Sequence, residues 1–186
     1  IALVGCQAQI LKEQLLKLKN VHWVVGNAEK MRLSDIVSDT FLLPDPQVMV
    51  SKILAEPFSE HHSAVDRHHT RANLKIQDGC DFYCAFCVIP FARGPARSRL
   101  FEDILREARE LVAAGHQELV LTGVNIGTYA CHGHSFMDII HALNRIDGLY
   151  RVRISSIEPT TIPEAIFDCM ADPDHNLCRH LHIPLQ

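Results

Sequence analysis

Apolar residues recur along the chain with two different periods, and this pattern predicts strands that alternate with helices. Residues 1–4 and 21–25 are short apolar runs typical of buried strands, and the segment between them, about residues 9–19, carries leucines at helical spacing. A further helix is expected over about residues 27–37, with Asn27 as its N-cap. Strands joined by helices in this order indicate the C-terminal part of a small α/β domain with a parallel sheet.

The periodicity fades over the next thirty or so residues, where prolines and histidines gather: Pro44, Pro46, Pro57, His61, His62, His68 and His69. This composition predicts a linker. We therefore expect three parts: the end of an N-terminal domain at residues 1–38, a linker at 39–71, and a second domain at 72–186 that is incomplete at its C-terminus.

The pattern becomes regular again in the second domain. Strands are expected at about residues 74–77, 118–122, 151–155 and 180–185, and helices at about 101–114, 136–146 and 163–171. Such alternation indicates a parallel sheet with right-handed crossovers, and a chain that stops on a strand favours a truncated, partial (β/α) barrel. In these barrels the chemistry gathers at the C-terminal ends of the strands. Polar residues stand there: Gln77, Asp78, Thr122, Asn125, Ser155, Ser156, Glu158 and Gln186.

Composition narrows the class of protein. The 186 residues are 47% hydrophobic, enough to bury a core, and carry a net charge of -4, so any contact with RNA is expected to be local or to come from segments outside these residues. No apolar run is long enough to span a bilayer, so no membrane partner is expected. The seven cysteines are clustered unlike those of a stapled secreted domain, which favours a reducing cytoplasm with metal-bound thiols.

Three cysteines in the stretch GCDFYCAFCVIP form the pattern C-x3-C-x2-C directly after the first strand of the second domain: Cys80, Cys84 and Cys87. Thiolates suit zinc or an iron-sulfur cluster, and structural sites of both kinds normally have four protein ligands. Three ligands leave a position open for substrate or cofactor. Phe86, just before the third cysteine, offers a ring for a bound base. The alternatives are a zinc site completed by an upstream histidine, in a non-catalytic zinc-binding module, and three unligated thiols.

The loop resembles the signature of radical S-adenosylmethionine enzymes. Its continuation, KIQDGCDFYCAFCVIPFARGPARSR, is similar to the methylthiotransferases of that group, as are GCQAQ near the start and the later GVNIGTY, RISSIEP and HLHIPLQ. Within the family, ARGPARSR and RISSIEP most resemble the branch that acts on N6-threonylcarbamoyladenosine in tRNA. The branches that act on isopentenyladenosine in tRNA, or on an aspartate of a ribosomal protein, fit less well.

The resemblance implies two 4Fe-4S clusters in the full-length protein. Cys80, Cys84 and Cys87 would hold the cluster whose open iron binds S-adenosylmethionine, and Cys6 would be the last of three ligands of an auxiliary cluster whose other ligands precede Ile1. A 5'-deoxyadenosyl radical would take hydrogen from C2 of the adenine, and a methylthio group would replace it. Without the resemblance, Cys6 is equally a small buried residue after a strand. Because two auxiliary ligands are missing, we expect these 186 residues to be inactive alone.

Further site residues rest on weaker signals. Thr122, Gly123 and Asn125 are candidate contacts of the cofactor's amino group, and Ser155 and Glu158 of its ribose, although each also fits a polar cap at a strand end. A basic group consisting of Arg93, Arg97 and Arg99 is a candidate contact of RNA phosphate or a cofactor carboxylate. Its alternative role is a solvated loop that leads to a helix capped by Ser98.

The remaining expectations concern partners and the other thiols. The resemblance implies a tRNA substrate, an electron donor such as flavodoxin or ferredoxin, a sulfur donor, and a cytoplasmic location. Cys131, in the sequence Cys-His-Gly-His, and Cys178 are expected to be incidental, and Cys169 is expected to be a core residue of a helix.

Overall fold

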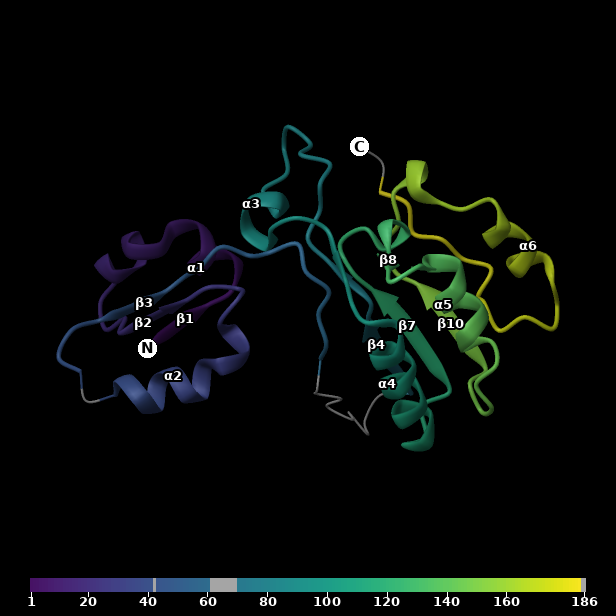
Figure 1. The fold of residues 1–186 in the computed structure, drawn as a ribbon, viewed down its shortest axis with the longest axis horizontal. Coiled ribbons are helices and arrows are strands. Elements are labelled where there is room, and N and C mark those ends of the chain that lie inside the picture. The colour runs from purple at the N-terminus through teal and green to yellow at the C-terminus, as the bar shows by residue number, and fades with distance from the viewer. Residues whose placement is uncertain (42, 61–69, 185–186) are drawn as a thin grey trace. The chain divides into compact units, whose positions relative to one another are not determined.

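The chain forms two compact units in the computed structural model (Figure 1), which describes residues 1–41, 43–60 and 70–184. The first unit combines residues 1–55 with residues 80–95, and the second combines residues 56–79 with residues 96–186. The cysteine loop from Cys80 onward thus packs with the N-terminal residues, although the pattern along the sequence assigned it to the second domain. Both units are mixed α/β structures with parallel sheets, which confirms the predicted fold class.

The first unit is built on a three-stranded parallel sheet in the order β1-β2-β3, with β1 at Ala2–Val4, β2 at Trp23–Val25 and β3 at Gln47–Met49. The parallel sheet agrees with the prediction. The third strand lies within the stretch predicted as linker, because three half-buried residues give no period that a sequence pattern can detect.

Helices of the first unit are short: α1 at Cys6–Leu11, followed by a 3-10 helix at Lys12–Lys17, then a 3-10 helix at Lys30–Arg32, α2 at Leu33–Thr40 and α3 at Ile89–Arg93. Ala8, Leu15, Val21 and Val24 form the core. The expected helix start at Asn27 is wrong, since α2 begins at Leu33. The Asn27 side chain instead donates hydrogen bonds to Cys6 and Ala92.

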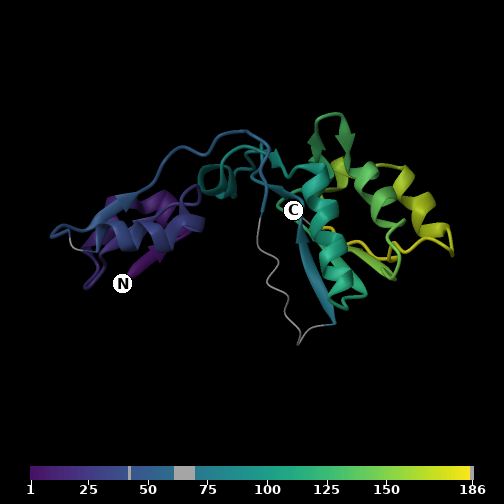
Figure 2. The ribbon, with the colours of Figure 1, turned by 60° about the horizontal axis from the view of Figure 1, so that its bottom comes forward.

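The second unit contains a parallel sheet in the order β10-β7-β4, with β4 at Arg71–Lys75, β7 at Glu118–Thr122 and β10 at Arg151–Ile154. A short antiparallel pair, β5 at Gln77–Asp78 and β6 at Arg97–Ser98, extends beyond β4. The hairpin of β8 at Ala130–Cys131 and β9 at His134–Ser135, seen in green in Figure 2, was not predicted. Two 3-10 turns, Ile126–Thr128 and Pro159–Thr161, follow β7 and β10.

The strand expected at residues 180–185 is not formed in the described part of this segment. His182 makes only an isolated parallel bridge to Ser156, and Pro184, which has no N–H, cannot continue a ladder. Gln186 lies outside the described residues.

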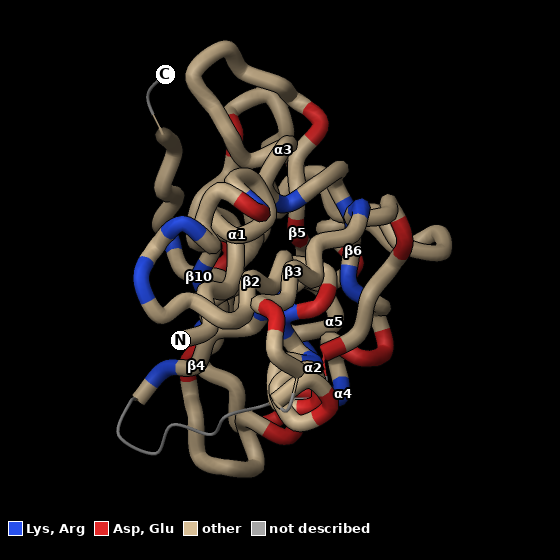
Figure 3. The backbone as a smooth tube through the Cα atoms, turned by 90° about the vertical axis from the view of Figure 1, so that its left-hand side faces the viewer, with Lys and Arg blue, Asp and Glu red and all other residues tan. Residues whose placement is uncertain are grey.

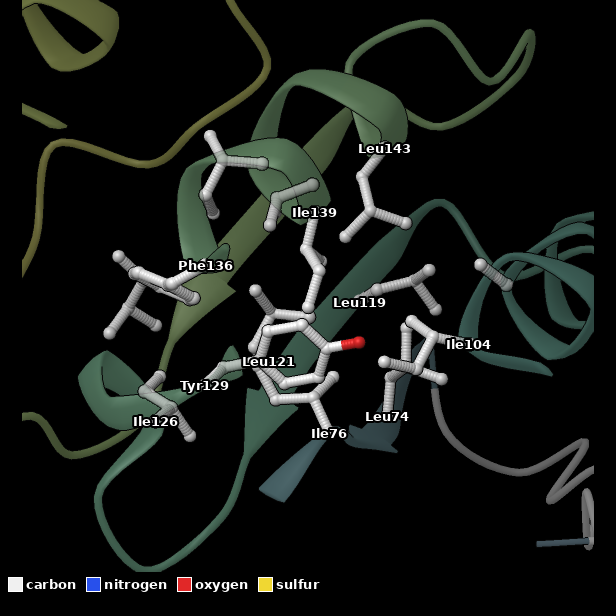
Figure 4. Packing of buried hydrophobic residues seen from close by; sticks show 14 of the residues in the cluster. Leu74, Ile76, Ile104, Leu119, Leu121, Ile126, Tyr129, Phe136, Ile139 and Leu143 are labelled. Atoms are coloured by element: carbon white, nitrogen blue, oxygen red, sulfur yellow. The ribbon is translucent and has the colours of Figure 1, made fainter. Parts of the chain in front are cut away.

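Helices α4 at Phe101–Ala113, α5 at Phe136–Leu143 and α6 at Ala165–Ala171 bury their apolar stripes in one core with the sheet. Figure 4 shows Ile104 of α4 and Ile139 and Leu143 of α5 converging on Leu119 and Leu121 of β7. The sheet edge at which all three parallel strands end is therefore held by a rigid core. On the outer face of α4, Arg106 forms ion pairs with Asp103 and Glu110.

Candidate functional site

The cysteine loop turns sharply after β5 and is closed by backbone hydrogen bonds. Gly79 and Tyr83 have positive φ values of 71° and 46°, conformations that glycine adopts easily and tyrosine rarely. Cys87 N donates to Cys84 O at 2.9 Å, and Cys80 N donates to Gly94 O at 3.2 Å. These hydrogen bonds hold the three cysteines in one loop. All three are free and half-buried, so their thiols remain accessible to a ligand.

The three thiols of the loop affect one another. Burial raises the pKa of the Cys80 thiol, and its interaction with Cys84 and Cys87 raises it further. A metal bound to all three sulfurs would favour their deprotonated form. Three thiolates in one loop suit zinc or an iron-sulfur cluster, and three protein ligands leave one position of either open.

Exposed aromatic side chains surround the loop. Phe82, Tyr83, Phe86 and Phe91 all expose much of their surface, and Phe86 is 74% exposed. Tyr83 and Phe91 meet edge to face with ring centroids 5.9 Å apart. A group of exposed aromatic rings forms an apolar surface that suits a flat ligand or a protein partner. The Phe86 ring is thus accessible to a ligand, and its stacking on a base stays a prediction.

Cys6 begins α1 in the same unit as the cysteine loop and is tied to it by Asn27. The Asn27 side-chain amide donates to Cys6 Sγ at 3.4 Å and to Ala92 O, on α3, at 2.7 Å. Its backbone N–H donates to Gln9 Oε1 at 2.9 Å. One buried amide thus links the helix that carries Cys6 to the helix that follows the cysteine loop. This role of Asn27 was not predicted, because the Gly-Asn pair after β2 was interpreted as the break before a helix.

Gln77 organises the strand ends of the second unit. Its Oε1 atom accepts hydrogen bonds from Val124 N at 2.9 Å and Asn125 N at 3.0 Å, while its Nε2 atom donates to Asp78 O and Gly79 O. A Cβ atom on Gly123 would lie 3.0 Å from both Gln77 O and Gln77 Oε1, so only glycine allows this close approach. Gln77 therefore clamps the loop after β7 to the segment before Cys80.

The loops after β7 and β10 also meet. Thr161 Oγ1 lies 2.9 Å from Asn125 Oδ1 and 3.0 Å from Glu158 O. Asn125 is only 1% exposed, and its Nδ2 atom has no hydrogen-bond partner among the described residues. An unsatisfied buried amide is costly and indicates a position for a further acceptor. The structure thus brings Asn125 together with the turn that begins at Glu158.

The other predicted cofactor contacts lie at the same strand ends. Thr122 O accepts a hydrogen bond from Ile76 N at 2.9 Å, and Ser155 N donates to Leu121 O at 3.1 Å. The backbone groups of Thr122 and Ser155 therefore form hydrogen bonds at the sheet edge, and Gly123 directly follows Thr122. Their side chains are half-buried, so a polar cap and a cofactor contact both remain compatible with their positions.

The three predicted arginines separate. Arg93 lies on α3 and is half-buried, and Arg97 pairs with Asp78 at 3.3 Å and stacks over the Phe58 ring at 5.4 Å. Arg99 is 0% exposed and binds Asp103 at 2.6 Å and also Glu107. The expectation that Arg99 contacts RNA or cofactor needs correction, because its guanidinium is used inside the second unit. Ser98 does not cap α4 either, since its hydroxyl accepts from Ala130 N.

Residues 74–186 match the family model of the Radical SAM superfamily, which spans more than half of the chain and includes the cysteine loop and all of these strand ends. The chain belongs to the radical SAM superfamily. Radical SAM proteins carry a 4Fe-4S cluster and S-adenosylmethionine, and the three free, half-buried thiols of one loop and the unsatisfied Asn125 amide fit such ligands.

Curated relatives match the whole chain. It is 35% identical over 190 residues to the "Threonylcarbamoyladenosine tRNA methylthiotransferase MtaB" of Bacillus subtilis and covers 42% of that protein. It is 32% identical to the "tRNA-2-methylthio-N(6)-dimethylallyladenosine synthase" of Alkaliphilus oremlandii, of which it covers 40%. The chain thus spans less than half the length of these relatives.

Among solved structures, the radical S-adenosylmethionine methyltransferase TsrM from Kitasatospora setae matches 70% of this chain and 27% of its own, with a TM-score of 0.52 and 18% identity. This likeness concerns the fold alone. A search of the described residues finds no helix long and apolar enough to cross a membrane.

Proposed function

We propose that this chain is part of a radical SAM methylthiotransferase that acts on tRNA. The supporting observation is the Asn27 amide, which joins the helix of Cys6 to the helix after the Cys80–Cys84–Cys87 loop within one unit. A radical SAM protein needs only the three-cysteine loop. A second thiol that is held in the same unit by a dedicated hydrogen bond is what a two-cluster enzyme requires, and Cys6 is our candidate ligand of the second cluster.

Each candidate site residue has a role in this proposal. Cys80, Cys84 and Cys87 would hold the 4Fe-4S cluster, and the cluster with bound S-adenosylmethionine supplies one-electron cleavage of the sulfonium and thereby radical abstraction of hydrogen. Phe86 offers its exposed ring for stacking with a base.

The strand ends would position the cofactor. The Asn125 amide, with Thr122 and Gly123 beside it, is suited to the amino-acid part of S-adenosylmethionine, because Nδ2 is a buried donor without an acceptor. Ser155 and Glu158 are candidates for its ribose. The closed core beneath these strand ends excludes water from one side of the site, which protects a reactive radical.

For the substrate, we propose N6-threonylcarbamoyladenosine in tRNA, modified at C2 of the adenine. The support is the likeness of ARGPARSR and RISSIEP to that branch, together with the relatives from Bacillus subtilis and Thermotoga maritima, both 35% identical. A relative named for dimethylallyladenosine, from Cereibacter sphaeroides, is also 35% identical, so that nucleoside is the second candidate. Arg93 and Arg97 are candidate contacts of tRNA phosphates. An electron donor such as flavodoxin or ferredoxin, a sulfur donor and a cytoplasmic location complete the proposal.

Mass spectrometry of tRNA nucleosides tests this function directly. We expect cells that lack the full-length gene to lose the 2-methylthio form of threonylcarbamoyladenosine, and the wild-type gene, but not a Cys84→Ala variant, to restore it. Loss of the methylthio form of dimethylallyladenosine instead would replace the proposed substrate with the second candidate. An unchanged nucleoside profile would contradict the proposal that the protein acts on tRNA.

A further inference from the structure

Two histidines and a cysteine meet on the second unit at a place with no part in the proposed cluster chemistry. His141 lies in the last turn of α5, Cys169 lies in α6, and His175 lies in the loop that follows α6. One potential ligand atom from each lies within 4.8 Å of the other two. The imidazole rings of His141 and His175 meet at 68° with centroids 6.3 Å apart. We propose that these three residues form a binding site for a divalent cation of the zinc class.

The donor set defines the class of metal. Imidazole nitrogen and thiolate sulfur are the preferred ligands of Zn²⁺, whereas Mg²⁺ and Ca²⁺ require oxygen. The three ligands come from two helices and a loop, so an ion would tie α6 to α5. Three protein ligands leave the fourth tetrahedral position to water or to another exchangeable group.

Burial and access also suit a bound ion. Cys169 is only 7% exposed, which shields a metal–sulfur bond, while His141 is exposed and leaves a path for the ion to enter. The loop that carries His175 is already fixed, because Asn176 N donates to Asn144 Oδ1 at 2.9 Å, just past the end of α5. Asp172 interacts electrostatically with both Cys169 and His175, and Asp168 with Cys169, and these two carboxylates favour a bound cation.

The hydrogen bonds of His175 show what binding would change. Its Nδ1 atom accepts from Leu177 N at 3.0 Å, which places the proton of the neutral ring on Nε2. Nε2 is buried and has no hydrogen-bond partner among the described residues. Coordination through Nε2 would satisfy this atom, move the proton to Nδ1 and break the bond from Leu177 N. The Leu177 amide is therefore a built-in reporter of metal at this site.

Cobalt binding tests the site, because Co²⁺ takes zinc positions and gives a sulfur-to-metal absorption band. The other candidate thiols are removed first by replacing Cys6, Cys80, Cys84 and Cys87 with serine, so the result does not depend on the proposed cluster function. We expect this protein to bind one Co²⁺ with a thiolate charge-transfer band and a shifted Leu177 amide resonance. Zn²⁺ should displace the cobalt.

Single substitutions in the same background identify the ligands. His141→Ala and His175→Ala should each weaken binding by at least about tenfold, and Cys169→Ser should abolish the charge-transfer band. His132→Ala, at an exposed histidine of the β8–β9 turn, is the matched control and should bind as before. His141 is exposed, so its replacement leaves the fold intact, as circular dichroism can verify. Absence of saturable binding in the parent protein would overturn the proposal. So would His141→Ala and Cys169→Ser variants that bind Co²⁺ as tightly as the parent protein does.

Discussion

Asn27 is the residue on which the link between Cys6 and the cysteine loop depends. Its amide donates to Cys6 Sγ and to the buried Ala92 O, and an aspartate of the same shape has no hydrogen to donate. We expect Asn27→Asp to lower the free energy of unfolding by about 1–3 kcal/mol, because two acceptors lose their donor. Urea denaturation measures this change. The exposed Asn20 offers a control, since Asn20→Asp should stay within about 0.5 kcal/mol of wild type. Equal stabilities of the two variants would refute the role of Asn27.

Asp103 links stability to pH. Burial opposes its ionisation, but hydrogen bonds from Arg99, Arg106 and the Glu60 N–H outweigh burial and lower the pKa of its carboxyl to about 2. An unfolded aspartate has a pKa of about 3.9. Because the folded pKa is the lower one, the stabilisation is complete above about pH 4 and is lost as the pH falls toward 2. The difference in unfolding free energy between wild type and Asp103→Asn should therefore shrink over this range.

Unfolding measured at several pH values between 2 and 6 gives that difference. Asp147→Asn, at an exposed position, is the control for a general effect of removing one carboxylate. A wild-type advantage that stays constant down to pH 2 would contradict the assigned hydrogen bonds.

Single residues also mark the limit of what could be predicted from the sequence. The three cysteines were identifiable because their spacing within one loop is itself the signal. Arg99 was assigned to RNA contact because a basic group near a site suggests phosphate binding, yet it is buried. Asp103 lies four residues after Arg99, and Glu107 lies four residues after Asp103. This helical spacing of opposite charges would have indicated an internal ion pair.

At the scale of elements, long periodic segments were predicted well and short ones were not. The strand expected at 118–122 is β7, and the helix expected at 101–114 is α4 to within one residue, because each repeats its apolar pattern. Strands β3, β8 and β9 have only two or three residues, too few to show a period of their own. Their formation is decided by tertiary packing, which local periodicity does not record.

Substitutions of Gln77 test whether its side chain holds the strand ends of the second unit together. Its Oε1 atom is the acceptor for two backbone N–H groups, those of Val124 and Asn125. Gln77→Leu keeps the volume but leaves both donors without a partner, so we expect the free energy of unfolding to fall by about 2–6 kcal/mol, at roughly 1–3 kcal/mol for each group. Gln77→Glu keeps the Oε1 acceptor and, with its carboxyl protonated, one donor toward Asp78 O or Gly79 O, so it should cost less at acid pH. Thermal or urea unfolding checks the order, and a Gln77→Leu protein as stable as the glutamate variant would exclude the clamp.

At the scale of the whole molecule, the two compact units are not consecutive segments of sequence. The cysteine loop follows a strand of the second unit but packs with the N-terminal residues, an arrangement that order along the chain does not reveal. The domain boundaries expected from the sequence stay a prediction, as does the inactivity of these 186 residues alone. Figure 3 shows acidic and basic residues interspersed along the backbone, consistent with the net charge of -4 and with RNA contact that is local.

The central claim is that Cys80, Cys84 and Cys87 hold an iron-sulfur cluster and not a zinc ion. Anaerobic reconstitution of the chain with iron and sulfide, followed by metal analysis and visible spectroscopy, tests it most directly. We predict a brown protein with about four iron and four sulfide per chain. Cys84→Ala should lose both the colour and the iron, and the control Cys178→Ala should keep them. A protein that stays colourless after reconstitution, or four iron and four sulfide retained in the Cys84→Ala variant, would contradict the account.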